Sequence, residues 1–153
     1  MSLALQTLGR VALQRGDYAE SEWLLNESLS IARDIRDRWL EAQALGRLGM
    51  LASARGNRTR ARKLHRGAVM AAVAAPLPIA LDELAALAEF ELGDQPGAAL
   101  AALAYVQNHP LAQPAARARA AQHIAVAEQR ADAEALARSF ALEQPSALLS
   151  LFN

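Results

Sequence analysis

Hydrophobic residues along the chain recur at the spacing of an α-helix. Leu5, Leu8 and Ala12 form an i, i+3, i+7 stripe, and the same residue types return at the same spacing at Leu45, Leu48 and Ala52. Ala and Leu dominate the chain, β-branched residues are sparse, and no segment alternates apolar with polar residues for long. The pattern therefore predicts an all-α protein.

The return of this stripe is part of an internal repeat. When residues 4–24 are laid over residues 44–64 without gaps, eight positions are identical, whereas about two matches are expected for unrelated windows of this composition. The matching residues include those that a helical hairpin requires. Gly9 allows a neighbouring helix to approach closely, and Gly16 can take the left-handed conformation that ends a helix. We therefore expect stacked helical hairpins.

Capping residues indicate where the helices begin and end. Gly16, Gly56 and Gly93 are expected to end helices, and Asp17 and Asp37 are placed to cap the helices that follow. The expected helices cover about residues 3–15, 18–36, 38–55, 58–75, 79–92, 94–107, 112–129 and 132–143. Paired in order, they give four repeats of a single domain at about 2–37, 38–75, 76–109 and 110–145, with 146–153 as a C-terminal cap.

The second expected helix has a defined set of inward candidates. Its periodicity points these residues toward the core: Trp23, Leu24, Ser28, Leu29, Ala32 and Ile35. Trp23 and Trp39 are assigned to packing within and between repeats, because large aromatic side chains at helical spacing are usually buried.

The repeated residues resemble the tetratricopeptide repeat, whose helix-turn-helix units carry a W-x2-L-G-x2-Y pattern followed by A-x3-F. The corresponding segments read Leu5-x2-Leu8-Gly9-x2-Ala12 and Leu45-x2-Leu48-Gly49-x2-Ala52, followed by Ser21-x3-Leu25 and Ala61-x3-His65. The period, given by the step from Leu5 to Leu45, resembles the longer variant found near the C-terminal end of large bacterial transcriptional activators of the MalT and LuxR type. The resemblance implies a right-handed α-solenoid of about four hairpins that binds a protein or peptide as the regulatory part of a larger protein.

In that family the first helix of each hairpin lines a concave binding surface, and the matched positions supply candidates in this chain. The candidates combine apolar anchors with scattered polar groups: Gln6, Arg10, Leu13, Gln43, Met50, Ser53, Glu83, Leu87 and Phe90. Such a mixture suits a peptide or a helix laid in a groove. Two alternatives stay open: some of these residues pack within the superhelix, or the groove takes a small ligand.

Charge is distributed unevenly although the formal net charge is zero. Residues 1–75 hold twelve Lys and Arg against seven Asp and Glu, while residues 76–153 hold four against nine. Arg58, Arg62 and Arg66 would form one basic stripe on a helix, a geometry that could follow a phosphate backbone. The stripe lacks interleaved aromatic residues for base stacking. This favours a solvated face or internal salt bridges, then an acidic protein partner, and nucleic acid last.

The residue inventory offers little for catalysis or metal binding. The chain has no Cys, and its three His residues, His65, His109 and His123, are far apart without the spacing of a metal site. The sequence contains no nucleophile motif built on Ser and no Gly-rich phosphate loop. We therefore expect a protein without enzymatic activity, metal or cofactor.

The two ends of the chain carry further expectations. The N-terminus lacks the basic region of a secretory signal, and the longest uncharged runs are too short or too rich in Pro to span a membrane, so a cytoplasmic location is expected. Leu3, Val11 and Leu13 lie off the first apolar stripe and would leave apolar surface where a preceding repeat would stack. The sequence therefore predicts a C-terminal portion of a longer regulator, and a homodimer through the N-terminal repeat in isolation.

Overall fold

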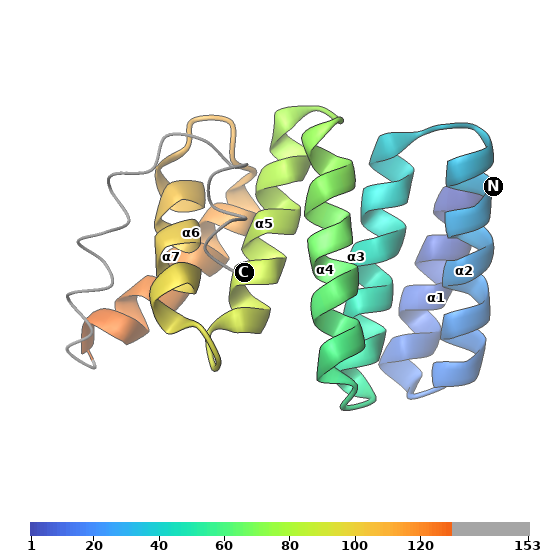
Figure 1. Ribbon diagram of the computed structural model, residues 1–153, viewed down its shortest axis with the longest axis horizontal. Helices are drawn as coiled ribbons and strands as arrows, with labels where there is room; N and C mark the ends of the chain where they lie inside the picture. The colour runs from blue at the N-terminus through green and yellow to red at the C-terminus, as the bar shows by residue number, and fades with distance from the viewer. Residues whose placement is uncertain (130–153) are drawn as a thin grey trace. The chain divides into compact units, whose positions relative to one another are not determined.

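The computed structural model describes residues 1–129, and all regular structure in this range is helical. The chain divides into two compact units, Met1–Ala75 and Pro76–Asn153. The first contains α1 (Ser2–Arg15), α2 (Tyr18–Asp34), α3 (Arg38–Ala54) and α4 (Arg58–Val73), and the described part of the second contains α5 (Leu77–Glu91), α6 (Pro96–Asn108) and α7 (Pro114–Gln129). Within each unit, consecutive helices pack as antiparallel neighbours (Figure 1). The prediction of an all-α protein is confirmed for the described residues.

The three turns of the first unit share one geometry. The backbone N–H groups of Asp17, Asp37 and Asn57 each donate to the carbonyl oxygen five residues earlier, at 2.9 Å in every case. The side chains of the same three residues each accept a hydrogen bond from the backbone N–H three residues later, at 3.0 or 3.1 Å. Each turn therefore closes one helix and caps the next. The turns recur at equal intervals, at positions 17, 37 and 57, and each interval is half the period visible in the sequence.

The residue before each of these caps takes the left-handed conformation. Gly16 and Gly56 do so with φ of 79° and 72°, as predicted for glycines that end helices. Arg36 occupies the same place in the second turn with φ of 55°. A residue with a side chain is disfavoured in this conformation by about 1–2 kcal/mol. The middle turn therefore holds the least favourable residue of the three.

Glycines let the two helices of each hairpin in the first unit approach closely. An ideal Cβ at Gly9 would lie 2.8 Å from Leu25 Cγ, and one at Gly49 would lie 2.9 Å from ring atoms of His65. The Ser21 hydroxyl also donates to the Gly9 carbonyl at 2.8 Å, a bond between α1 and α2 that a wider separation would prevent. The predicted packing role of Gly9 is confirmed.

Burial on α1 differs from burial on α3 although the two helices correspond in sequence. Leu48 on α3 is 2% exposed, whereas Leu8, at the matching position of α1, is 55% exposed. The difference arises because α3 packs against both α2 and α4, while α1 packs mainly against α2. Leu8 belongs to the apolar stripe of the sequence, but it is not buried in this structure. The residues of α1 that are buried are Ser2, Gln6, Gly9 and Ala12.

Two inward predictions for the second expected helix, at Trp23 and Ile35, are wrong. Trp23 is 64% exposed and Ile35 is 60% exposed, while Leu24, Ser28, Leu29 and Ala32 are buried as predicted. Trp23 stands two residues before the fully buried Leu25, which places it about 200° around the helix, on the outer side. Trp39 is half-buried.

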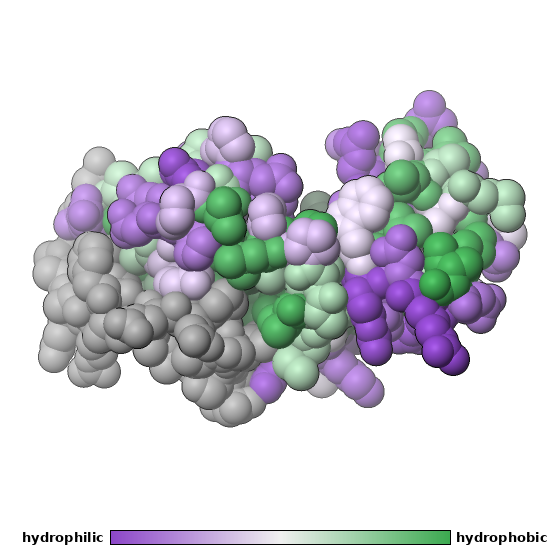
Figure 2. Space-filling model, turned by 90° about the horizontal axis from the view of Figure 1, so that it is seen from above, coloured by the Kyte–Doolittle hydropathy of each residue, from purple (hydrophilic) through white to green (hydrophobic). Residues whose placement is uncertain are grey.

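The surface of the first helices therefore mixes apolar and polar residues. Figure 2 shows green apolar atoms beside purple hydrophilic ones over the part of the molecule that holds the N-terminal helices. Trp23 and Leu8 are among the large hydrophobic residues of these helices that are exposed. Among residues 1–129, no helix has both the length and the apolar composition that a membrane crossing requires.

In the second unit, Pro residues mark the starts of the helices. α5 begins at Leu77, two residues before the expected start, because Pro78 is tolerated in a first turn where its missing N–H is not needed. α5 ends just before Gly93, but Gly93 has no positive φ and Gln95 is the residue that precedes α6, so this turn differs from the turn at Gly16. Fully buried apolar side chains make the core, among them Leu81, Leu84, Leu87, Leu100, Leu103 and Val106. The expected helix 132–143 and the C-terminal cap lie outside the described residues.

Candidate functional site

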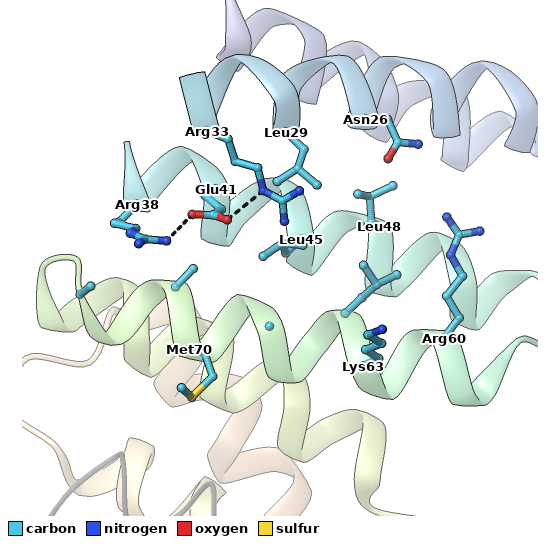
Figure 3. Close-up of a pocket in the computed structure, with 14 residues that line it drawn as sticks. Asn26, Leu29, Arg33, Arg38, Glu41, Leu45, Leu48, Arg60, Lys63 and Met70 are labelled. Atoms are coloured by element: carbon cyan, nitrogen blue, oxygen red, sulfur yellow. Dashed lines mark hydrogen bonds and ion pairs between the residues drawn. The ribbon is translucent and has the colours of Figure 1, made fainter. Parts of the chain in front are cut away.

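A groove of about 750 Å³ lies in the first unit between α2 and α4, with α3 between them (Figure 3). Apolar side chains from all three helices line its central part: Leu29, Leu45, Leu48, Leu64 and Met70. Charged side chains stand at its two ends. The groove is therefore an elongated apolar surface with polar ends.

Small residues on α4 make room for this groove. Gly67 and Ala71 line it at i and i+4, so they share one side of the helix, and Ala74, the residue that follows α4, also lines it. An ideal Cβ at Gly67 would lie 3.6 Å from Leu45 Cδ1, an ordinary van der Waals distance. A methyl group would fit at this position, but a larger side chain would enter the groove.

At one end of the groove two arginines share one carboxylate (Figure 3). Arg33 Nε donates to Glu41 Oε1 at 3.0 Å, and Arg38 Nη1 donates to Glu41 Oε2 at 2.8 Å. Burial raises the pKa of Glu41, but the hydrogen bonds from Arg33 and Arg38 outweigh it and hold this pKa below its ordinary value. The two arginine side chains remain 57% and 59% exposed. Because a guanidinium has five N–H donors, both can still donate to a ligand.

Arg60 and Lys63 lie at the other end of the groove (Figure 3). Arg60 Nη2 donates to Glu22 Oε1 at 2.7 Å, and Arg55 bonds the second oxygen of the same carboxylate. The hydrogen bond from Arg60, reinforced by Arg55, holds the pKa of Glu22 below its ordinary value against the opposing effect of burial. Lys63 is exposed, and its ammonium group makes no hydrogen bond or ion pair in the described part of the chain. This end therefore carries an uncompensated positive charge.

Two of the residues predicted for a concave groove are buried. Gln6 joins α1 to α3, because its Nε2 donates to the Leu40 carbonyl at 3.1 Å and its Oε1 accepts from Arg47 at 2.6 Å. Leu87 belongs to the core of the second unit. Neither side chain offers surface to a partner in this structure.

The other predicted groove residues have accessible side chains but do not line the groove observed here. Arg10, Met50 and Ser53 are exposed, and Leu13, Gln43, Glu83 and Phe90 are half-buried. On α3, Gln43 and Met50 lie about 140–200° around the helix from Leu45 and Leu48, which form the base of the groove. The observed groove is therefore on the opposite side of α3 from the predicted surface.

The basic stripe is also separate from the groove. Arg58 is exposed, Arg62 and Arg66 are half-buried, and each of the three takes part in a polar interaction within the chain. The cations of α4 that line the groove are Arg60 and Lys63 instead.

None of the residues that line the groove is among the binding candidates that the sequence supplied. Asn26, Leu29, Lys63 and Met70 come from α2 and α4, whereas the repeat pattern directed attention to α1 and α3. The sequence feature that could have indicated the groove is the set of small residues on one side of α4, beginning at Gly67. Small residues leave space beside a helix.

One carboxyl group of the second unit is poorly solvated. Asp82 Oδ1 is buried and has no hydrogen-bond partner in the described residues. Burial raises the pKa of Asp82, and the positive charge of Arg119 opposes this only in part. Arg119 itself pairs with Glu89 at 2.9 Å. The ionised form of Asp82 is therefore unfavourable for the fold.

Within residues 1–129, no three or more His, Asp or Glu side chains are grouped to hold a metal ion. Comparison of this chain with protein-family models, curated proteins and solved structures finds no match.

Proposed function

We propose that this chain is a non-catalytic interaction module that holds a segment of another protein in the groove between α2 and α4. The supporting observation is the apolar surface formed by Leu29, Leu45 and Leu48 with residues of α4, which is long, open and bordered by polar groups. An amphipathic helix or an extended peptide buries its apolar side on such a surface and leaves its polar side in water.

The resemblance to the tetratricopeptide repeat supports a proposal for the fold and for the parent protein as well. The hairpins would belong to a right-handed α-solenoid, and the chain would be the partner-binding part of a larger bacterial transcriptional regulator in the cytoplasm. The three equally spaced turns at Asp17, Asp37 and Asn57 support a modular helical array. The identity of the parent protein rests on the resemblance alone.

A small-molecule sensor is the second candidate function. The groove volume of about 750 Å³ is within the range of small-ligand sites. Such sites usually enclose most of the ligand, whereas this groove is open along its length (Figure 3). The shape therefore favours a macromolecular segment.

A pair of substitutions at Gly67 tests the proposed function. Binders selected from a display library of amphipathic peptides should lose at least about tenfold in affinity for Gly67→Phe, because the ring would occupy the space over Leu45. Gly67→Ala is the matched control and should keep affinity within about twofold, since its Cβ meets only an ordinary contact. Peptides that bind both variants equally would contradict the proposal.

A further inference from the structure

We propose that the groove selects an acidic amphipathic helix that lies along it, with carboxylates that meet the cationic groups at its two ends. This inference rests on the proposed function and names the chemistry of the partner. Three properties of the groove carry it: the sign of its charge, the distance between its charged ends, and the apolar character of its base.

The charge of the groove lining is strongly positive. Among the described residues, four cations, Arg33, Arg38, Arg60 and Lys63, line it against the carboxylate of Glu41. The exposed ammonium of Lys63 has no partner in the described residues, so a carboxylate placed beside it would gain an ion pair without displacing another. A basic segment would instead meet like charge at both ends.

The two charged ends are separated by about three helical turns. Arg38 lies at one end, and Leu48, ten residues later on α3, lies toward the same end of the groove as Lys63 (Figure 3). At about 1.5 Å per residue, this part of α3 is about 15 Å long. A helix that lies alongside α3 would cover the same length with about ten or eleven residues. Acidic residues at that separation would therefore reach both ends together, with apolar residues between them.

The base of the groove distinguishes a peptide from a nucleic acid. Leu29, Leu45 and Leu48 form an aliphatic surface that excludes water when apolar side chains cover it. Within the described part of the chain, the groove lining contains no aromatic side chain on which a base could stack. A phosphate backbone would satisfy the cations but would leave the leucines without apolar contacts. The combination therefore favours an acidic peptide.

Glu41 has a specific place in this arrangement. Its carboxylate accepts from both Arg33 and Arg38 and occupies donors that a partner's carboxylate would otherwise use. Replacing it by Gln removes this internal competitor and raises the positive charge of the groove by one. Glu41→Gln should therefore bind an acidic partner more tightly, unlike most substitutions in a binding site.

Three synthetic helical peptides test the inference on the full chain. They share one apolar face and carry, at two positions eleven residues apart, either Glu, Gln or Lys. Fluorescence anisotropy at low salt should show the Glu peptide binding about threefold to tenfold tighter than the Gln peptide, and the difference should shrink with added salt. The Lys peptide should bind most weakly.

Variants at Lys63 and Glu41 complete the test. Lys63→Glu should remove the preference at one end, and a peptide with Lys at the matching end should recover affinity for this variant. Glu41→Gln should increase affinity for the Glu peptide about twofold or more. Because Lys63 is exposed and unpaired in the described residues, Lys63→Glu should keep the helical circular dichroism of the parent.

The outcomes separate this inference from the proposed function. Equal binding of the Glu and Gln peptides, with both blocked by Gly67→Phe, would overturn the acidic preference and leave the peptide groove standing. Failure of all three peptides and of the display library to bind would overturn both. If a single-stranded oligonucleotide displaces the Glu peptide, and if this competition is lost in Lys63→Glu, the ligand of the groove would be a nucleic acid and the proposed peptide partner would be wrong.

Discussion

The imidazole ring of His65 lies against the backbone of Gly49, where an ideal Cβ would be 2.9 Å from three ring atoms. His65 is 4% exposed, so its ring has little room to withdraw. α3 and α4 can therefore pack at this distance only because position 49 has no side chain. The same relationship joins Gly9 to Leu25 in the first hairpin.

Gly49→Ala should consequently destabilise the protein. Overpacking of a core costs about 1–3 kcal/mol, and the gain in helix propensity from Gly to Ala returns about 1 kcal/mol, so a net loss of up to about 2 kcal/mol is expected. Gly67→Ala, on the same pair of helices, should raise stability by up to about 1 kcal/mol, because its Cβ meets only Leu45 at 3.6 Å. Urea unfolding of both variants checks the contrast, and an unchanged or higher stability of Gly49→Ala would refute it.

Arg36→Gly should stabilise the first unit. Arg36 has φ of 55°, and it stands at the position of its turn where the two other turns have glycine. Removing its side chain relieves about 1 kcal/mol of strain, of which the greater freedom of glycine in the unfolded chain takes back a part. A net gain of about 0.5 kcal/mol is expected in thermal or urea unfolding. Gly56→Ala is the converse change and should lower stability; a loss of stability in Arg36→Gly would show that the side chain matters more than the turn.

Leu8 and Leu48 match in the repeat but should respond differently to truncation. Leu48→Ala removes a side chain that is 2% exposed and should cost about 2–4 kcal/mol. Leu8→Ala should cost less than about 1 kcal/mol, because Leu8 is 55% exposed. Chemical denaturation of the two variants makes the comparison.

The exposed side of α1 also provides a test of self-association. We propose that the homodimer expected from the sequence forms through this side, where Leu8 and Leu3 are 55% and 47% exposed. Sedimentation equilibrium should then show dimers that Leu8→Glu dissociates. Met70→Glu, at an exposed apolar residue of α4, is the control and should leave the association unchanged. A monomer at all concentrations would exclude the homodimer.

The ion pairs of Glu22 and Glu41 should contribute to acid sensitivity. Both groups have a pKa below the ordinary value of 4.5 in the folded protein. The folded state therefore favours their charged forms, so their stabilising effect is present above pH 4.5 and is lost as the pH falls through the lowered pKa values. Replacing both by Gln should flatten the fall in stability over this acidic range. Melting temperatures measured from neutral to acidic pH check the slope.

Asp82 should show the opposite dependence. Burial raises its pKa above the ordinary value of 3.8, so the folded state favours the protonated carboxyl group and loses stability as the pH rises through the raised pKa. Asp82→Asn should therefore raise the melting temperature at neutral pH and change it little where the carboxyl group is protonated in both states. A lower melting temperature at neutral pH would mean that the attraction of Arg119 outweighs burial.

Local features of the first unit could be predicted from the sequence because their causes are local. Gly16 and Gly56 end helices as expected, and Asp17 and Asp37 accept the capping hydrogen bonds. Such features depend on the conformation of a few adjacent residues. The left-handed Arg36 escaped prediction because arginine gives no signal for that conformation; only the recurrence of the turn explains it.

Features that depend on which helices become neighbours could not be predicted in the same way. Leu8 and Leu48 are the same residue in the same pattern, and their exposure differs because different helices surround them. The groove is a property of three helices together, and its open space depends on a missing side chain at Gly67. A periodic pattern predicts which side of a helix is apolar, but it does not predict which other helix packs against that side.

The equal spacing of the turns at Asp17, Asp37 and Asn57 has a consequence for how such a chain can grow. Since every turn reverses the course of the backbone, duplication of one helix with its turn would invert the polarity of everything downstream. Duplication of two helices with their turns preserves this polarity. It also keeps each glycine of the close approach opposite the side chain that packs on it, as Gly9 is opposite Leu25. This architecture can therefore be lengthened only by whole pairs of helices. The repeat that the sequence shows, from Leu5 to Leu45, spans one such pair.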